Sequence, residues 1–230
     1  MNPIIDISNI EFQYSGAEKP TLNIQQFQIQ KGEKIFLFGP SGGGKSTLLE
    51  ILAGILVPQK GQVSILGQNL NQLSSVERDQ FRAGHLGYIF QSFNLIPYLN
   101  VRENIELPLH LSPLRRSRLG DNLTQKKEFH HIVTALGIDH LIEKKVTELS
   151  VGQAQRVAVA RALYGKPELI LADEPTSSLD HDHREKFIHL LFRICEESKT
   201  TVLFVSHDRS LEKMFDRSVK LSEINQVGQS

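Results

Sequence analysis

Short apolar runs bounded by polar residues predict the strands of a parallel sheet. Four runs are apolar at nearly every position, which is typical of strands buried on both faces beneath covering helices. These runs are residues 34–38, 86–90, 169–172 and 201–205. Two earlier segments, 4–14 and 22–30, alternate apolar and polar residues instead, and this alternation predicts half-exposed antiparallel strands near the N-terminus.

Helical patterns lie between the predicted strands, and a second group of them forms an insertion. The patterns between the strands cover residues 46–56, 76–82, 183–197 and 211–215. Residues 96–149 break the strand rhythm, with a polar, turn-rich connection at 112–122. The helix-like segments on either side of that connection are residues 101–111, 125–136 and 138–145. The chain therefore reads as one α/β domain, with a catalytic lobe of residues 1–95 and 150–230 and a helical subdomain of residues 96–149.

The composition narrows the class of protein. The 230 residues carry 26 basic and 26 acidic side chains, so no overall charge draws the chain to nucleic acid or to an anionic membrane. A single cysteine, Cys195, falls in an apolar helical pattern and indicates a buried thiol in a reducing compartment. The N-terminus has no signal-peptide pattern, and no apolar stretch approaches the roughly 20 residues of a membrane span. We therefore expect a cytoplasmic chain that meets a membrane only through another subunit.

A glycine-rich segment follows the first parallel strand. The sequence GPSGGGKST fits the pattern G-x-x-x-x-G-K-[ST] between a strand and a helix, and the alternative is a glycine-rich turn that precedes a lysine by chance. Glycines let successive backbone N–H groups point at phosphate oxygens, while Lys45 reaches the β- and γ-phosphates and the Ser46 hydroxyl binds Mg²⁺. The predicted nucleotide-binding residues are Gly39, Pro40, Ser41, Gly42, Gly43, Gly44, Lys45, Ser46 and Thr47.

Polar side chains also follow the other three parallel strands. Asp173 is placed to hold Mg²⁺ and Glu174 to act as general base on an attacking water, although both could instead cap the next helix. Gln91 could bind the metal or orient water, or be a solvated loop amide. His207 could donate a hydrogen bond to the γ-phosphate, or be structural. Because ligands bind beyond the carboxyl ends of parallel strands, we expect these four residues along one sheet edge.

The segment ELSVGQAQRVAVARAL, residues 148–163, predicts a largely buried helix with a polar start. Ser150 and Gln153 have the spacing of a capping box, in which each side chain bonds a backbone N–H group of the first turn. Capping does not explain Gly152, which brings bare backbone to a helix N-terminus, where anions bind. The sequence therefore also predicts an anion at this helix end.

In order along the chain, these motifs resemble those of the ATP-binding subunit of ABC transporters, and the match extends over nearly the whole length. Tyr14 resembles the aromatic residue that stacks on adenine. The remaining correspondences are residues 39–47 with the Walker A loop, Gln91 with the Q-loop glutamine, LSVGQ (149–153) with the LSGGQ signature, LILADE (169–174) with Walker B, SSLD (177–180, ending in Asp180) with the D-loop and His207 with the switch histidine. Because the motifs occur together and in order, the resemblance is specific.

The resemblance implies a P-loop NTPase fold, with a RecA-like parallel core, an N-terminal antiparallel β subdomain and an inserted α-helical subdomain. It implies an ATPase that drives a separate transmembrane permease subunit. It further implies a head-to-tail homodimer around two ATP, in which Ser150, Gly152 and Gln153 of one copy close over the ATP and Mg²⁺ held by Lys45 and Ser46 of the other. ATP binding then closes the dimer, and hydrolysis opens it.

Residues 82–109, RAGHLGYIFQSFNLIPYLNVRENIELPL, are similar to the family branch that serves lipoprotein release and macrolide efflux. That similarity implies export or the extraction of lipoprotein or lipid, at the inner face of the cell membrane, with residues 91–98 and the helical insertion receiving a coupling helix. Val151 replaces the commoner glycine of the signature, and we expect it to be tolerated because first-turn helix positions have negative φ.

Two alternatives to a transport ATPase remain. One is an ATP-dependent regulatory module that controls a membrane partner without transport; Glu174 argues against a catalytically silent form of it. The other is a soluble P-loop kinase or DNA-repair ATPase. The signature argues against a kinase, and residues 96–149 lack the sustained heptads or DNA-binding elements of a repair enzyme.

Overall fold

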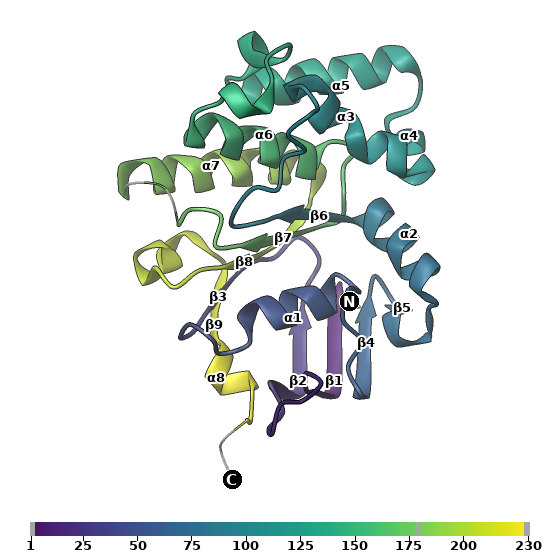
Figure 1. Ribbon diagram of the computed structural model, residues 1–230, viewed down its shortest axis with the longest axis vertical. Helices are drawn as coiled ribbons and strands as arrows, with labels where there is room; N and C mark the ends of the chain where they lie inside the picture. The colour runs from purple at the N-terminus through teal and green to yellow at the C-terminus, as the bar shows by residue number, and fades with distance from the viewer. Residues whose placement is uncertain (1–2, 178, 180, 228–230) are drawn as a thin grey trace. The chain divides into compact units, whose positions relative to one another are not determined.

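The computed structural model describes residues 3–177, 179 and 181–227, except for the side chains of residues 181–183. The chain forms two units, Met1–Arg82 together with Thr201–Ser230, and Ala83–Thr200 (Figure 1). Each unit has strands and a hydrophobic core of its own.

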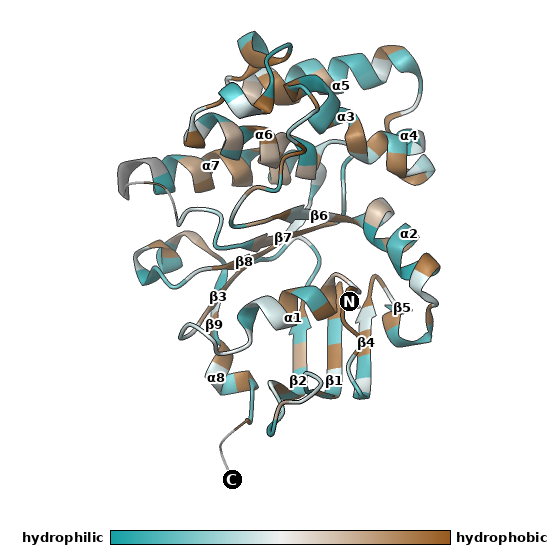
Figure 2. Ribbon diagram, in the orientation of Figure 1, coloured by the Kyte–Doolittle hydropathy of each residue, from teal (hydrophilic) through white to brown (hydrophobic). Residues whose placement is uncertain are grey.

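The first unit begins with the antiparallel sheet predicted from the alternating segments. β1 (Ile5–Phe12) lies between β2 (Leu22–Ile29) and β4 (Lys60–Ile65), and β4 also pairs with the short β5 (Gln68–Asn69). Alternate residues of β1 and β2 are buried, and brown and teal alternate along these strands in Figure 2. Ile5 lies opposite both Ile29 and Ile65, so the apolar side chains share one face. The 3-10 turn η1 (Leu70–Gln72) and helix α2 (Ser75–His85) follow.

The glycine-rich segment follows the middle one of three parallel strands in the first unit. β3 (Lys34–Phe38) pairs with β8 (Thr201–Val205) and with β9 (Arg217–Lys220), parallel to both. Every residue of β8 is buried, as are the three central residues of β3, and burial on both faces explains their continuous apolar sequences. Helix α1 (Lys45–Leu52) follows β3, the 3-10 segment η4 (Arg209–Met214) follows β8, and α8 (Leu221–Ile224) follows β9.

The second unit contains a parallel pair of strands covered by a helix. β6 (Leu86–Ile89) pairs with β7 (Leu169–Asp173). Helix α6 (Val151–Leu163) packs closely on β6 because Gly87 has no side chain. A Cβ atom on Gly87 would lie 2.4 Å from the Ala162 carbonyl oxygen. Helix α7 (His181–Ser198) carries Cys195, which is fully buried, as its apolar pattern predicts.

The insertion between β6 and β7 differs from its sequence prediction in two places. Its helices are α3 (Val101–Leu111), α4 (Pro113–Leu119) and α5 (Asn122–Ala135), and the 3-10 turns η2 (Asp139–Leu141) and η3 (Val146–Glu148) follow. The prediction of a turn-rich connection at 112–122 is wrong, because α4 forms there: Ser112 accepts the N–H of Arg115 as N-cap, and Pro113 occupies the first turn.

The prediction of a helix at 138–145 is also wrong, since only the single 3-10 turn η2 forms within those residues. Gly137 ends α5 with a φ of 64°. The carbonyls of Ile142 and Lys144 then accept the N–H groups of Arg102 and Val101 instead of continuing a helix. Long-range backbone bonds to the start of α3 therefore replace the local ones.

Candidate nucleotide-binding site

The segment after β3 has the backbone of a phosphate-binding loop. Gly42 and Gly44 have φ values of 75° and 97°, which side-chain-bearing residues rarely adopt. A Cβ atom on Gly44 would also lie 2.9 Å from the Leu22 side chain. Lys45 Nζ donates to the carbonyl oxygens of Gly39 at 2.9 Å and Pro40 at 3.0 Å, so its ammonium group lies across the loop. This curled backbone with a cation inside it fits a chain of phosphates.

Ser46 and Thr47 lie side by side in the first turn of α1 but in different surroundings. Ser46 is exposed, and its hydroxyl has no hydrogen bond to any residue that the structure describes. Thr47 is buried, and its Oγ1 lies 3.1 Å from Tyr14 Oη. The Tyr14 ring packs edge-on against Phe12, with centroids 4.9 Å apart, and is 43% exposed. Tyr14 is thus anchored beside the loop with part of its ring open to a ligand.

His207 belongs to the same strand edge as the loop. β3 and β8 run parallel with Leu37 opposite Val205, and the Ser206 N–H donates to the Leu37 carbonyl at 3.1 Å. The next residue, His207, is exposed. The first unit therefore brings the loop and His207 to the carboxyl ends of its parallel strands, as the sequence predicts.

In the second unit, β6 and β7 bring an amide and two carboxylates to a common edge. Ile89 lies opposite Ala172, so Gln91 and Asp173 follow at the same end of the parallel pair. Glu174 has a φ of 47°, a left-handed conformation that is unfavourable for this residue type and is found disproportionately at functional sites. The Glu174 carbonyl accepts the Ser177 N–H at 3.1 Å, which closes a turn directly after β7.

The N-terminus of α6 has the predicted capping box. Ser150 Oγ accepts the N–H of Gln153 at 3.3 Å, and Gln153 Oε1 accepts the N–H of Ser150 at 2.9 Å. Among the residues that the structure describes, and apart from the helix's own backbone and the two chain neighbours, no atom lies within 4 Å of the position that a Cβ on Gly152 would take. Val151, in the same first turn, is 54% exposed. This helix end is therefore capped internally while its backbone remains accessible at Gly152.

The predicted residues are divided between the two units. The loop, Tyr14 and His207 belong to the first. The second contains Gln91, Ser150, Gly152, Gln153, Asp173 and Glu174. Asp180, the predicted D-loop residue, lies outside the described residues.

Two structural arginines of the second unit were not identified from the sequence. Arg161, in the last turn of α6, donates to the carbonyl oxygens of Phe93 and Asn94 at 2.6 and 2.7 Å. Arg115, on α4, is only 2% exposed and donates to several backbone carbonyls. The only sequence signal for either is a cation within an otherwise apolar or capped helix, and that signal does not name its partners.

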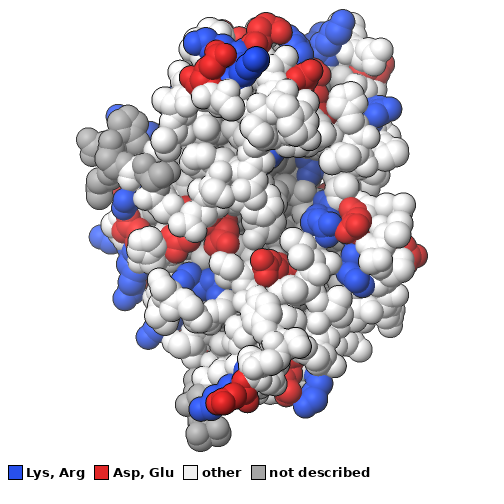
Figure 3. All heavy atoms as spheres, in the orientation of Figure 1, with Lys and Arg blue, Asp and Glu red and all other residues white. Residues whose placement is uncertain are grey.

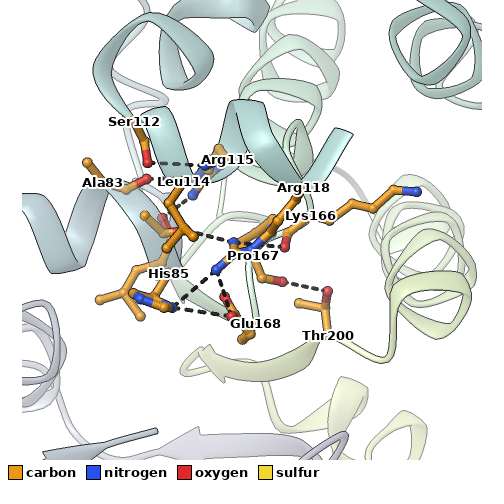
Figure 4. Close-up of polar contacts among 12 residues, drawn as sticks. Ala83, His85, Ser112, Leu114, Arg115, Arg118, Lys166, Pro167, Glu168 and Thr200 are labelled. Carbon is orange, nitrogen blue, oxygen red and sulfur yellow. Dashed lines mark hydrogen bonds and ion pairs between the residues drawn. The ribbon is translucent and has the colours of Figure 1, made fainter. Parts of the chain in front are cut away.

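Arg115 anchors a polar cluster, shown in Figure 4. Its guanidinium donates to the carbonyl oxygens of Ala83, Leu86, Ala162 and Tyr164. Burial lowers the pKa of Arg115 to about 10, with a further contribution from the neighbouring charge of Arg118. Arg118 in turn donates to Glu168 Oε1 at 2.7 Å, and His85 Nδ1 lies 3.2 Å from the same oxygen.

The surface view in Figure 3 shows charged groups of both signs. On the face shown in Figure 3, acidic and basic side chains are interspersed, in keeping with their equal numbers in the chain. Among the helices that the structure describes, none combines the length and the apolar character that crossing a bilayer requires.

Comparison with known proteins decides the family. A family model described as ABC transporter matches residues 22–177, more than half of the chain. The chain belongs to the ABC transporter family. This ABC protein is an ATP-binding subunit that hydrolyses ATP, as the motifs predict.

Relatives of this ABC ATPase match it along most of its length. The lipoprotein-releasing system ATP-binding protein LolD of Hydrogenovibrio crunogenus is 37% identical over 222 residues, covering 96% of this chain and 94% of the relative. The uncharacterized ABC transporter ATP-binding protein YbbA of Escherichia coli K12 is 42% identical over 193 residues, covering 84% and 82%.

Solved structures confirm the predicted fold class. The dimeric post-hydrolysis state of the ATP-binding cassette MJ0796, bound to ADP and Pi, matches with a TM-score of 0.83 and 35% identity, over 94% of this chain and 93% of that one. The antiparallel N-terminal sheet, the parallel strands and the helical insertion are those of an ABC ATPase.

Proposed function

We propose that this ATPase works as a head-to-tail homodimer that encloses two Mg–ATP and drives a separate transmembrane subunit. The observation that carries the proposal is the start of α6, where the capping box satisfies the helix internally and leaves the Gly152 backbone open to an incoming anion. The triphosphate on the loop of a second copy is such an anion. The dimeric MJ0796 cassettes support this arrangement.

The proposed roles follow the chemistry of each side chain. Backbone N–H groups of residues 39–47 and Lys45 hold the β- and γ-phosphates, and Tyr14 stacks on adenine. Ser46, Gln91 and Asp173 would supply the oxygen ligands that Mg²⁺ prefers, and the exposed hydroxyl of Ser46 fits that task. Bound Mg²⁺ would neutralise charge on the phosphate oxygens.

Hydrolysis is assigned to the remaining residues. Glu174 accepts a proton from the attacking water, and His207 donates a hydrogen bond to the γ-phosphate. Ser150, Gly152 and Gln153, together with Asp180, complete the partner's site from across the dimer. Because the γ-phosphate bridges the two copies, its release removes the bridge and the dimer opens.

The proposed transport function is export, or extraction of lipoprotein or lipid. The name of the LolD relative, a lipoprotein-releasing system ATP-binding protein, supports the release of lipoprotein. Two features of the insertion region support a membrane partner. Tyr98 is 83% exposed, and α3 and α5 border a groove of about 900 Å³ that includes Leu109 and Phe129. Residues 91–98 do not line that groove, so the proposed contact with a coupling helix rests on the exposed segment that contains Tyr98.

The dimer proposal is tested by the concentration dependence of ATP hydrolysis. Turnover per molecule should rise with protein concentration, and Glu174→Gln should elute as a dimer from size-exclusion chromatography in saturating Mg–ATP. Constant turnover per molecule, together with a monomeric Glu174→Gln protein, would contradict it.

Identification of the membrane protein that copurifies in detergent separates transport from the second candidate function, a regulatory module without transport. A partner with a large external domain and no substrate path would favour regulation. A permease active in a reconstituted lipoprotein or lipid release assay would favour transport.

A further inference from the structure

The two ends of α6 meet different parts of the candidate site. At its N-terminus, Ser150 caps the helix, and space is left beside the Gly152 backbone. In its last turn, Arg161 holds the carbonyl oxygens of Phe93 and Asn94, which follow Gln91 by two and three residues. Both ends and the segment after Gln91 belong to the second unit.

The segment held by Arg161 has an unfavourable backbone. Phe93 and Asn94 have φ values of 62° and 47°, so two adjacent residues with side chains lie in the left-handed region. Such a conformation persists only where its surroundings hold it. Local bonds join the Phe93 N–H to the Phe90 carbonyl at 3.0 Å and the Asn94 N–H to the Ser92 carbonyl at 2.7 Å. The two charge-assisted bonds from Arg161 reach this turn from a different element and oppose its relaxation.

Helix α6 is well suited to transmit a displacement. It has 13 residues, most of its second half is buried, and the Ala162 backbone packs directly on β6 at Gly87. Arg161 is half-buried, and burial lowers the pKa of its guanidinium, which nevertheless stays charged at neutral pH. One helix thus links Ser150 at its N-terminus to the carbonyls of Phe93 and Asn94 at its last turn.

We propose that Arg161 is a positioning residue that couples the N-terminal end of α6 to Gln91. Arrival of an anion at Ser150 shifts α6, the two hydrogen bonds of Arg161 move the Phe93–Asn94 turn, and Gln91 takes its working position. The inference rests on the proposed function, in which Gln91 binds the metal or orients water.

A double-mutant cycle tests the coupling in the intact protein. Arg161→Lys keeps the charge but cannot present two N–H groups to two carbonyls as a guanidinium does. We expect kcat to fall about tenfold, with the ADP dissociation constant and the KM for ATP within about twofold of wild type. Combining Arg161→Lys with Gln91→Ala should cost little more than the worse single change, because both act through Gln91. Multiplicative effects would overturn the proposal.

A matched control lies on the same helix. Arg156 donates through Nη1 to one carbonyl, Leu136, at 3.2 Å, away from the turn after Gln91. Arg156→Lys should leave kcat within about twofold of wild type. An equal loss for Arg156→Lys and Arg161→Lys would show a general effect on α6 and overturn the proposal.

Hydrogen exchange reads the same contact without any enzymatic activity. The amides of Phe93 and Asn94 should exchange faster in Arg161→Lys than in wild type or Arg156→Lys. Unchanged exchange in Arg161→Lys would show that Arg161 does not hold the Phe93–Asn94 turn and would overturn the proposal. An inactive wild-type protein in which Arg161→Lys still speeds this exchange would instead refute the proposed ATPase mechanism.

Discussion

At the scale of the residue, Arg115 shows how much structure one buried side chain can organise. Its guanidinium donates to four backbone carbonyls of the second unit and so joins α4 to the start of β6 and the end of α6. Arg115→Met would remove the guanidinium donors from all four carbonyls. We expect the free energy of unfolding to fall by about 3 kcal/mol in urea denaturation.

The control for that prediction is the neighbouring residue. Arg116 donates to one carbonyl, that of Leu109, at 2.9 Å. Arg116→Met should cost about 1 kcal/mol or less. Equal losses for the two variants would mean that the network around Arg115 contributes nothing beyond an ordinary surface contact.

The carboxylate of Glu168 predicts an acid-sensitive step in stability. Burial alone would raise its pKa, but the hydrogen bond with His85 and the charge of Arg118 outweigh burial and hold the pKa below its ordinary value of 4.5. A carboxylate whose pKa is lower in the folded than in the unfolded protein stabilises the folded state at pH values above the unfolded pKa. That contribution is lost as the pH falls through the folded pKa. Thermal denaturation from pH 7 downward should therefore show a steeper loss below pH 4.5 for wild type than for Glu168→Gln. Parallel curves would contradict this role.

At the scale of the element, the start of α6 separates capping from anion binding. Ser150→Arg removes the cap and fills the open end with a long side chain, so turnover should fall about 100-fold while ADP affinity is kept. Val151→Gly should change turnover by less than about twofold, because Val151 is exposed and already helical. Steady-state kinetics and calorimetric titration with ADP measure both variants. A large gain from Val151→Gly would show that the signature is impaired by valine.

The residue directly after the short helix α8 holds the segment that packs against the phosphate loop. The Asn225 side chain accepts the Asn23 N–H at 2.8 Å and donates to the Thr21 carbonyl at 3.1 Å, and residues 21–22 form the wall against Gly44. Asn225→Ala should loosen this wall and raise the ADP dissociation constant about fivefold, in proportion to two lost hydrogen bonds.

A matched control for Asn225 exists in the same unit. Asn71 accepts the Val63 N–H at 2.9 Å on the antiparallel sheet. Asn71→Ala should lower the melting temperature without changing ADP affinity. If both variants leave ADP binding unchanged, α8 stabilises the fold but does not shape the loop.

At the scale of the whole molecule, the division of site residues between two units predicts a two-stage response to nucleotide. ADP should protect amides of the first unit around Tyr14 and residues 39–47, since those residues hold the phosphates. Mg–ATP added to Glu174→Gln should additionally protect residues 149–153 of the second unit, because a partner's triphosphate then covers them. Hydrogen exchange with each nucleotide measures this. Protection of residues 149–153 by ADP alone in a monomer would contradict the shared site.

Local sequence patterns by themselves determined many of the secondary-structure elements and the functional motifs of this protein. The parallel strands, the antiparallel start, the glycine-rich loop and the capping box of α6 are all confirmed, because each depends on residues adjacent in sequence and on backbone preferences that those residues carry themselves. The ABC motifs are likewise contiguous, so the family and the ATPase activity follow from the chain alone.

Only the tertiary structure decided the features that depend on distant partners. The strands β4 and β9 are too polar to be recognised from a hydrophobic pattern. They form because β4 pairs with β1 and β9 pairs with β3. Residues 142–144 stay out of a helix because α3 takes their carbonyls. Arg115 and Arg161 find carbonyls far along the chain, and no local pattern encodes which ones, because hydrogen-bond partners of this kind are selected by packing rather than by spacing.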